Sequence, residues 1–278
     1  ESLGNPKLDV LDLKAISKAA QTYKVPFIVD NTVATPFLLN PIEHGANIVI
    51  HSLTKYIGGN GTSLGGVIID AGNFDWSNGK FPEFTEPSAG YHGLKYYEVL
   101  GAASFIAKVR IEGLRDLGAS LSPFNAFQII QGLETLAIRI KKHSENALEL
   151  AKWLQKRPEV AWVNYPGLIS SKYYDLAQQY LPEGQSGIVT FGLKGGYEAA
   201  KKVADETQFF SLLANIGDTK SLIIHPASTT HQQLSEEQQI TTGVTKDLIR
   251  LSVGLEDIED LKADLQSVFE KLPVQNLV

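Results

Sequence analysis

The chain has 278 residues, of which 43% are hydrophobic and 20% charged, a composition typical of a folded globular protein. Its 25 basic and 31 acidic side chains give a formal charge of -6, which argues against nucleic acid bound through a broad basic face. The absence of cysteine excludes disulfides, cysteine nucleophiles and thiolate metal sites. No apolar run approaches the roughly 20 residues that span a bilayer, so we expect a cytoplasmic protein without a membrane partner.

The first part of the chain alternates helix and strand patterns. Residues 8–24 carry apolar side chains at helical spacing. Residues 25–30, 46–52 and 65–70 are short apolar runs, as expected of buried strands. Strands that alternate with helices predict an α/β fold with a mainly parallel sheet.

Residues 71–101 interrupt this alternation, because they are rich in Gly, Pro and aromatic side chains and have no clear period. Six Phe and Tyr side chains between Phe74 and Tyr97 favour packing over disorder. A connection of this length is usually functional, so we expect a lid or a subunit contact.

A long helical region is predicted from about residue 98 to residue 156, with an interruption near Pro123. A second α/β unit follows, with strand patterns at 187–193 and 221–226. Its helices are predicted at 197–206 and 258–272. We therefore predict two domains, residues 1–148 and 149–278.

One lysine, Lys55, stands between a strand pattern and a glycine-rich turn. With Ser52 it has the Ser-x-x-Lys spacing of acyl-transferases, but their Ser-Asp-Asn and Lys-Thr-Gly elements do not occur in the chain. The glycines follow the lysine, whereas a Walker loop places the lysine after them. A third interpretation is that Lys55 holds pyridoxal phosphate covalently, which requires a carboxylate for the ring nitrogen and donors for the phosphate.

The sequence offers candidates for both requirements. Asp30 follows the apolar run 25–29, at the carboxyl end of a strand, although an Asp there is often only a helix cap or turn former. Ser52 and Thr54 flank Lys55 and could donate hydroxyls to a phosphate. The absent elements and the order of lysine and glycines argue against the acyl-transferase and the Walker loop, and from spacing alone a solvated surface lysine and a cofactor-binding lysine both remain open. No metal site is expected, because His225 and His231 lack a third ligand.

The stretch "VDNTVATPFLLNPIEHGANIVIHSLTKYIGGNGTSLGG" resembles the cysteine/methionine-metabolism family of pyridoxal-phosphate enzymes. The stretches "SLIIHPASTTH" and "LIRLSVGLEDIEDL" extend the resemblance over essentially the whole chain. It implies the type I fold of PLP-dependent transferases, with a large cofactor-binding domain and a smaller C-terminal α/β domain. It also implies a further stretch of chain before Glu1, and a homotetramer built as a dimer of dimers.

Position by position, the resemblance implies that Lys55 carries pyridoxal 5'-phosphate covalently and that Asp30 pairs with the ring nitrogen. It implies phosphate contacts for Ser52 and Thr54. The residues that it implies for binding the substrate carboxylate are Asn5, Asn215 and Arg250. Arg250, taken alone, would be interpreted as a surface or ion-paired arginine.

Three stretches are similar to the branch of the family that transfers sulfide onto O-acetylhomoserine: "FTEPSAGYHGLKYYE", "SPFNAFQIIQGLETL" and "LLANIGDTKSLIIHPASTTHQQ". The resemblance therefore implies γ-replacement, in which O-acetyl-L-homoserine and sulfide give L-homocysteine and acetate. The alternatives are a cystathionine γ-synthase or a γ-lyase, including a methionine γ-lyase, on the same scaffold. An alternative of another class is a non-catalytic fragment or interaction protein that keeps the fold.

Overall fold

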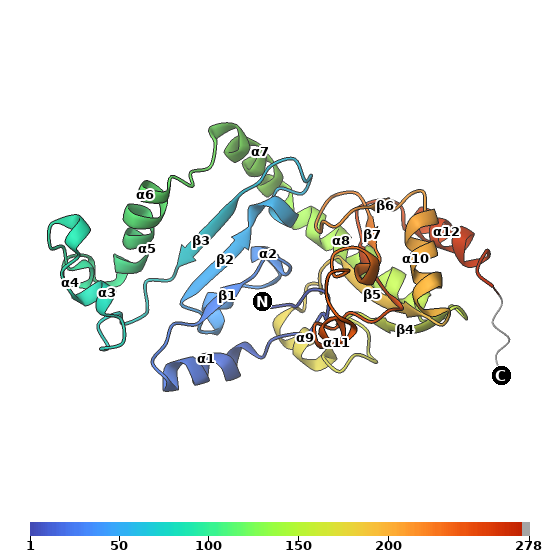
Figure 1. Cartoon of the computed structure of the whole chain (residues 1–278), viewed down its shortest axis with the longest axis horizontal. Coiled ribbons are helices and arrows are strands. Elements are labelled where there is room, and N and C mark those ends of the chain that lie inside the picture. Colours follow the sequence, from blue (N-terminus) through green and yellow to red (C-terminus); the bar gives the residue numbers. More distant parts are fainter. Residues whose placement is uncertain (274–278) are drawn as a thin grey trace.

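The computed structural model describes residues 1–273 as two sheets joined by helices. One sheet has the strand order β1-β2-β3, and the other has the order β4-β5-β8-β7-β6. Figure 1 shows the first sheet in the middle of the molecule, the second sheet at one end, and helices α3 to α6 at the other. Within the described residues, no helix is long and apolar enough to cross a membrane.

The strands of the first sheet are β1 (Ile28–Asp30), β2 (Ile48–Ser52) and β3 (Gly66–Asp70). The helices that accompany it are α1 (Leu13–Thr22) and α2 (Thr35–Leu38). These elements confirm the predicted α/β alternation. The side chain of Asp12 starts α1 by accepting a hydrogen bond from the amide of Ala15, as expected of an N-cap residue.

The two strand pairs of this sheet differ in direction. β1 and β2 are parallel, whereas β2 and β3 are antiparallel. The connection from β1 to β2 contains α2 and a 3-10 helix, which provide the crossover that parallel strands need. The chain turns back through residues 53–65 without such a crossover, so β3 runs in the opposite direction. Within this sheet, therefore, only the pair β1 and β2 has the expected parallel arrangement.

The aromatic segment, residues 71–101, folds together with the residues up to Leu117 into an arm of short helices. They are α3 (Pro82–Thr85), α4 (Tyr96–Leu100), α5 (Ser104–Lys108) and α6 (Arg115–Leu117). Trp76, Phe84 and Tyr96 are buried together in this arm. The ring of Trp76 also stacks on Phe105 with 5.2 Å between centroids. The packing predicted for this segment is therefore confirmed.

The long helical region is interrupted just before Pro123, as predicted, and it is also divided at Thr135, which the sequence did not predict. Its two long helices are α7 (Pro123–Glu134) and α8 (Leu136–Leu154). Pro123 occupies the first turn of α7, where its missing amide costs nothing, and the hydroxyl of Ser122 accepts from the amide of Asn125.

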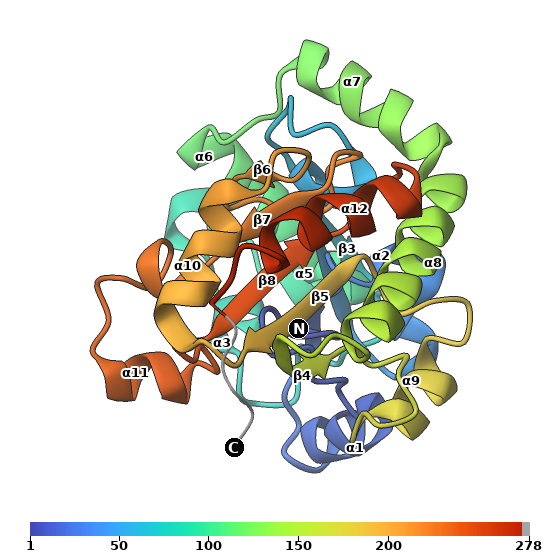
Figure 2. The ribbon, with the colours of Figure 1, turned by 90° about the vertical axis from the view of Figure 1, so that its right-hand side faces the viewer.

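The strands of the second sheet are β4 (Val160–Asn164), β5 (Ile188–Leu193), β6 (Ser211–Leu212), β7 (Leu222–Ile224) and β8 (Leu248–Ser252). Its helices are α9 (Tyr174–Tyr180), α10 (Gly196–Glu206), α11 (Glu236–Thr241) and α12 (Ile258–Phe269). Helices α8, α10 and α12 pack together over one face of this sheet (Figure 2). Every residue of β5 is buried, because β5 lies between β4 and β8 and beneath these helices.

Two clusters of buried apolar side chains meet along α8. Leu136 and Ile140, near its start, belong to the cluster that includes the first sheet. Leu150 and Leu154, near its end, belong to the cluster under α10 and α12. We propose that the two domains divide at residue 148, since the buried side chains of α8 pass from one cluster to the other between Ile140 and Leu150.

Candidate active site

Lys55 lies in the turn that follows β2. The turn Leu53–Ile57 is a single turn of π-helix, in which the amide of Gly58 donates to the carbonyl of Leu53 at 2.9 Å. The backbone departs from helical geometry at Lys55 itself, where φ is -89° and ψ is -132°. Because the turn begins at the carboxyl end of a strand with a parallel neighbour, Lys55 stands where open α/β sheets bind ligands.

The amine of Lys55 has an environment that favours its neutral form. It is half-buried and donates a hydrogen bond to Oδ1 of Asn215, a residue 160 positions away in the chain. Burial lowers the pKa of Lys55, and the positive charge of Arg250 lowers it further. A neutral amine has the lone pair that a nucleophile or a base requires.

Arg250 reaches the same place from β8 of the second sheet. Its Nη1 donates to Oδ1 of Asn5 at 3.2 Å, and its Nη2 donates to the backbone carbonyl of Asn215 at 3.1 Å. Among residues 1–273 no carboxylate forms an ion pair with it, and its buried Nε has no hydrogen-bond partner. Burial lowers the pKa of Arg250 to about 10, so it is a cation near neutral pH. A buried cation with an unused donor suits an anionic oxygen.

The loop that carries Asn5 is tied to the end of β1. The amide of Ser2 donates to the carbonyl of Asp30 at 2.9 Å, and the hydroxyl of Ser2 donates to Oδ1 of Asn31 at 2.7 Å. These bonds fix the loop beside the first sheet while Asn5 contacts Arg250 of the second sheet. The two sheets are therefore linked at this point.

Asp30 lies at the carboxyl end of β1, as predicted. Its Oδ1 accepts from the amide of Thr32 at 2.9 Å. Asp30 is opposite Ile50 in the β1–β2 register, so the alternation of side chains places Ser52 on the same face of the sheet. The negative charge of Asp30 raises the pKa of His51, but burial lowers it more, and the net shift is downward.

The two hydroxyl residues beside Lys55 differ in their partners. Oγ1 of Thr54 accepts from the amide of Gly65 at 3.1 Å, a bond that closes the glycine-rich turn. The backbone amide of Ser52 donates to Oγ1 of Thr32 at 2.8 Å, while its own hydroxyl has no hydrogen-bond partner among the described residues. The Ser52 hydroxyl is thus free for a ligand, and that of Thr54 would be shared.

Tyr56, next to Lys55, anchors the turn in the protein interior. Its side chain is fully buried, and its hydroxyl accepts from the amide of Gly187 at 3.2 Å. Its ring meets that of His143 edge to face, with 5.3 Å between centroids. The loop that carries Asn215 also packs here, because a Cβ on Gly217 would lie only 2.6 Å from the amide nitrogen of Tyr56.

The structure joins four of the seven predicted site residues by hydrogen bonds: Lys55, Asn215, Arg250 and Asn5. The other three, Asp30, Ser52 and Thr54, lie at the ends of the neighbouring strands β1 and β2 and form no hydrogen bond to that group among the described residues. Sequence reasoning missed the supporting roles of Tyr56, Thr32 and Gly217, since nothing in their spacing indicates their contacts.

The chemistry of these groups fits pyridoxal phosphate. A half-buried lysine with a lowered pKa suits covalent attachment, and a carboxylate on the adjacent strand suits the ring nitrogen. In the described part of the chain the Ser52 hydroxyl and Nε of Arg250 donate to no protein group, and both suit anionic oxygens. The fit therefore rests on the donor set and on its position at one edge of the first sheet.

The two histidines considered for a metal are hydrogen-bonded to protein groups. The ring nitrogens of His225 lie 2.8 Å from Oγ of Ser228 and 2.8 Å from the carbonyl of Lys246. Nδ1 of His231 lies 2.8 Å from Oγ1 of Thr230. In the part of the chain that the structure describes, no three His, Asp or Glu side chains form a metal-binding group.

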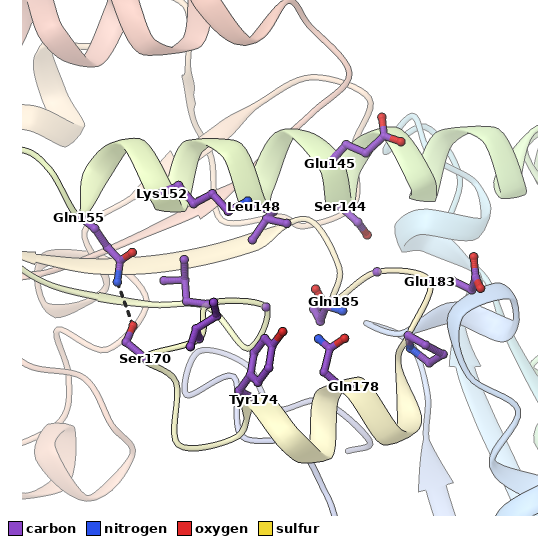
Figure 3. A pocket seen from close by; sticks show the side chains of 15 residues that line it. Ser144, Glu145, Leu148, Lys152, Gln155, Ser170, Tyr174, Gln178, Glu183 and Gln185 are labelled. Carbon is purple, nitrogen blue, oxygen red and sulfur yellow. Dashed lines mark hydrogen bonds between the residues drawn. The ribbon is translucent and has the colours of Figure 1, made fainter.

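A separate cavity of about 770 Å³ lies between α8 and α9 (Figure 3). Ser144 and Lys152 of α8 face Tyr174 and Gln178 of α9 across it. Neither Lys55 nor Arg250 is part of its lining, so this cavity is distinct from the candidate active site.

Comparison with known proteins places this geometry in a family. Residues 1–270 match the profile of the family described as "Cys/Met metabolism PLP-dependent enzyme". O-acetyl-L-homoserine sulfhydrylase of Leptospira meyeri is 56% identical over 98% of this chain and 64% of its own length. Homocysteine/cysteine synthase of Saccharomyces cerevisiae is 47% identical over 97% of this chain and 64% of its own length.

A solved structure extends the likeness to three dimensions. A crystal structure from Campylobacter jejuni, described as an O-acetylhomoserine (thiol)-lyase with N'-pyridoxyl-lysine-5'-monophosphate, is similar to this chain with a TM-score of 0.93 and 48% sequence identity. The likeness covers 97% of this chain and 64% of that one. The chain thus spans just under two thirds of the length of these relatives, and it belongs to the Cys/Met metabolism family of PLP-dependent enzymes.

Proposed function

We propose that the full-length protein is a PLP-dependent sulfhydrylase, which converts O-acetyl-L-homoserine and sulfide into L-homocysteine and acetate. The observation that carries this proposal is the contact of the Lys55 amine with Asn215, whose backbone carbonyl accepts from Arg250, a guanidinium that no carboxylate among residues 1–273 neutralises. A nucleophilic amine next to a carboxylate-binding cation suits an amino-acid substrate. The names of the relatives at 47% to 56% identity support the sulfhydrylase reaction.

In this proposal each site residue has one role toward the cofactor. Lys55 holds pyridoxal 5'-phosphate covalently, Asp30 keeps the ring nitrogen protonated, and Ser52 and Thr54 bind the phosphate. When bound, the cofactor ring takes up the electron pair that remains on the substrate's α carbon after proton loss.

The substrate carboxylate is proposed to bind at Arg250. Within residues 1–273 its Nε has no hydrogen-bond partner, and Asn5 and Asn215 lie beside the guanidinium. A guanidinium binds a carboxylate through two parallel hydrogen bonds and therefore fixes its orientation. With the carboxylate held there, the substrate's α carbon is directed toward the region of the Lys55 amine.

Lys55 is also proposed to move protons. Once the substrate amine has displaced it from the cofactor, its neutral amine accepts the proton from the α carbon and then assists proton transfer at the β carbon. The C–O bond at the γ carbon breaks, and acetate leaves with the electron pair of that bond. A C–S bond from sulfide then forms at the same carbon, and protons return to the β and α carbons, which gives L-homocysteine. The lowered pKa of Lys55 supports this role, because a protonated amine cannot act as a base.

The remaining parts of the proposal concern the assembly. We propose a homotetramer, a dimer of dimers, that works in the cytoplasm. Exposed apolar side chains on the described surface support contacts with further protein: Ile28 and Ile68 on the first sheet, and Phe124, Phe127 and Ile130 on α7. Surface apolar clusters of this kind are typical of contact sites.

The test uses full-length wild-type protein, Lys55→Ala, and Lys18→Ala as an exposed lysine control. Borohydride reduction followed by peptide mass spectrometry should place the cofactor on Lys55 in the wild type and in the control. Lys55→Ala should lose both this label and turnover, and full activity in that variant would refute the assignment. Asp30→Ala should retain part of the cofactor but lose turnover.

The sulfur donor separates the related reactions. Rates with O-acetylhomoserine are compared for sulfide, methanethiol and cysteine, and the proposal requires sulfide to be preferred. Preference for cysteine would identify a cystathionine γ-synthase instead. A full-length wild-type protein without bound cofactor or turnover would favour the non-catalytic alternative.

A further inference from the structure

Arg139, in the first turn of α8, is a buried cation close in the fold to the Lys55 turn. Only 8% of its surface is exposed. Among residues 1–273 it forms no ion pair with a carboxylate. A buried guanidinium is costly unless its donors are satisfied, so its partners indicate what it does.

Its partners are three backbone carbonyls and one hydroxyl. Nη1 donates to the carbonyl of Tyr56 at 2.7 Å, and Nη2 donates to that of Ile57 at 3.0 Å. Nη2 also donates, at 2.6 Å, to the carbonyl of Gly132, which lies in the last turn of α7. Nε donates to Oγ1 of Thr135 at 3.0 Å. One planar group therefore joins the two residues after Lys55 to the junction of α7 and α8.

Two glycines stand where these groups approach one another closely. A Cβ on Gly59 would lie 2.4 Å from Nη1 of Arg139. A Cβ on Gly132 would lie 2.3 Å from the carbonyl oxygen of Gly58. The backbone that follows Lys55 thus comes close to α7 at Gly132 and close to the guanidinium of Arg139 at Gly59.

We propose that Arg139 is a positioning residue that sets where the Lys55 amine lies. The inference rests on the proposed function of Lys55. The amine donates to Asn215 from the end of the Lys55 side chain, and the backbone at residues 55–57 sets where that side chain starts. Arg139 holds that backbone by its carbonyls, without contacting the amine.

A lysine at position 139 would not replace this function. Its ammonium is a single point, whereas the guanidinium presents donors in a fixed fork that reaches separate carbonyls. Arg139→Lys keeps the charge but should release at least one carbonyl of the Lys55 turn. A displacement of about 1 Å at a reacting group can lower a rate about 100-fold.

The test compares full-length wild type with Arg139→Lys and with Lys141→Gln, an exposed change on the same helix. We expect kcat to fall about 100-fold in Arg139→Lys while KM changes little, because the substrate contacts at Arg250 remain. The control should match wild type. Unfolding temperatures are measured for all three, so that a loss of stability alone can be recognised.

A second measurement does not depend on turnover. Cofactor-free protein is labelled with acetic anhydride over a range of pH, and the label on Lys55 is quantified by mass spectrometry. In Arg139→Lys the pKa of Lys55 should move upward, toward its ordinary value, because the displaced amine is less buried. If Arg139→Lys does not fold, Thr135→Val keeps the guanidinium but removes the bond to Nε, together with the bond from the Thr135 hydroxyl to the carbonyl of Gly132, and should shift kcat and labelling in the same direction.

The outcomes separate this inference from the proposed function. Unchanged kcat together with an unchanged labelling profile of Lys55, in a folded Arg139→Lys or Thr135→Val protein, would overturn the positioning role. A wild-type protein that carries no cofactor on Lys55 would instead overturn the proposed function. The labelling profile would still report whether Arg139 positions the amine.

Discussion

Gly217 offers a direct test of how tightly the Lys55 turn is packed. Its φ of +74° lies in the left-handed region, and an added Cβ would be 2.6 Å from the amide nitrogen and 2.8 Å from Cγ of Tyr56. Gly79 is a matched control, because its φ is +90° and an added Cβ would meet nothing within 4 Å. Gly217→Ala therefore combines backbone strain with a clash, and Gly79→Ala has the strain alone.

The difference in magnitude follows from these two causes. Placing alanine in the left-handed region costs about 1–2 kcal/mol. Overpacking against buried atoms adds about 1–3 kcal/mol. We therefore expect Gly79→Ala to lose about 1–2 kcal/mol and Gly217→Ala about 2–5 kcal/mol of unfolding free energy.

The loss of catalytic activity should depend on the steric clash at residue 217 and not on the backbone strain that both variants share. The atom that the new Cβ would meet belongs to the peptide bond between Lys55 and Tyr56, so its displacement moves Lys55 directly. We expect kcat of Gly217→Ala to fall about 10- to 100-fold, and that of Gly79→Ala to stay near wild type. Denaturant unfolding and steady-state rates of the full-length proteins measure both effects. Equal stability and equal rates in the two variants would refute the proposed packing.

Three further predictions concern charge and the aromatic arm. Arg250→Gln should raise the pKa of Lys55, since the positive charge that lowers it is removed, and acetic anhydride labelling of Lys55 should then shift to higher pH. Burial lowers the pKa of His143 from 6.5 to about 4. Above pH 6.5 this shift stabilises the fold by up to about 3 kcal/mol compared with its stability below pH 4, and the stabilisation is lost as the pH falls from 6.5 to 4. His143→Gln should remove that dependence in denaturant titrations, whereas exposed His92→Gln should keep it. Trp76→Ala should destabilise the aromatic arm by about 3–5 kcal/mol and make the arm easier to cleave by limited proteolysis. Equal cleavage rates in the variant and the wild type would contradict this.

Much of the local structure could be predicted from the sequence by itself. Apolar runs indicated β1, β2 and β3, and Pro123 indicated the start of α7, because period and proline chemistry act over a few residues. Lys55 and Asp30 could be selected since each follows such a run, at the strand ends where ligands bind. The direction of β3 was not predictable from its own residues, because it depends on how the Lys55 turn reverses the chain.

Only the tertiary structure brought the distant residues of the site together. Arg250 meets Asn5 across 245 positions of sequence, and Lys55 meets Asn215 across 160. Arg139 gave no signal of its contact with the carbonyls of the Lys55 turn, since a backbone acceptor carries no side-chain identity. Short-range patterns arise from the geometry of single helices and strands, whereas contacts between elements depend on how those elements pack. For that reason the sequence alone could propose Lys55 as a candidate, but only the folded chain defined what its amine and its backbone contact.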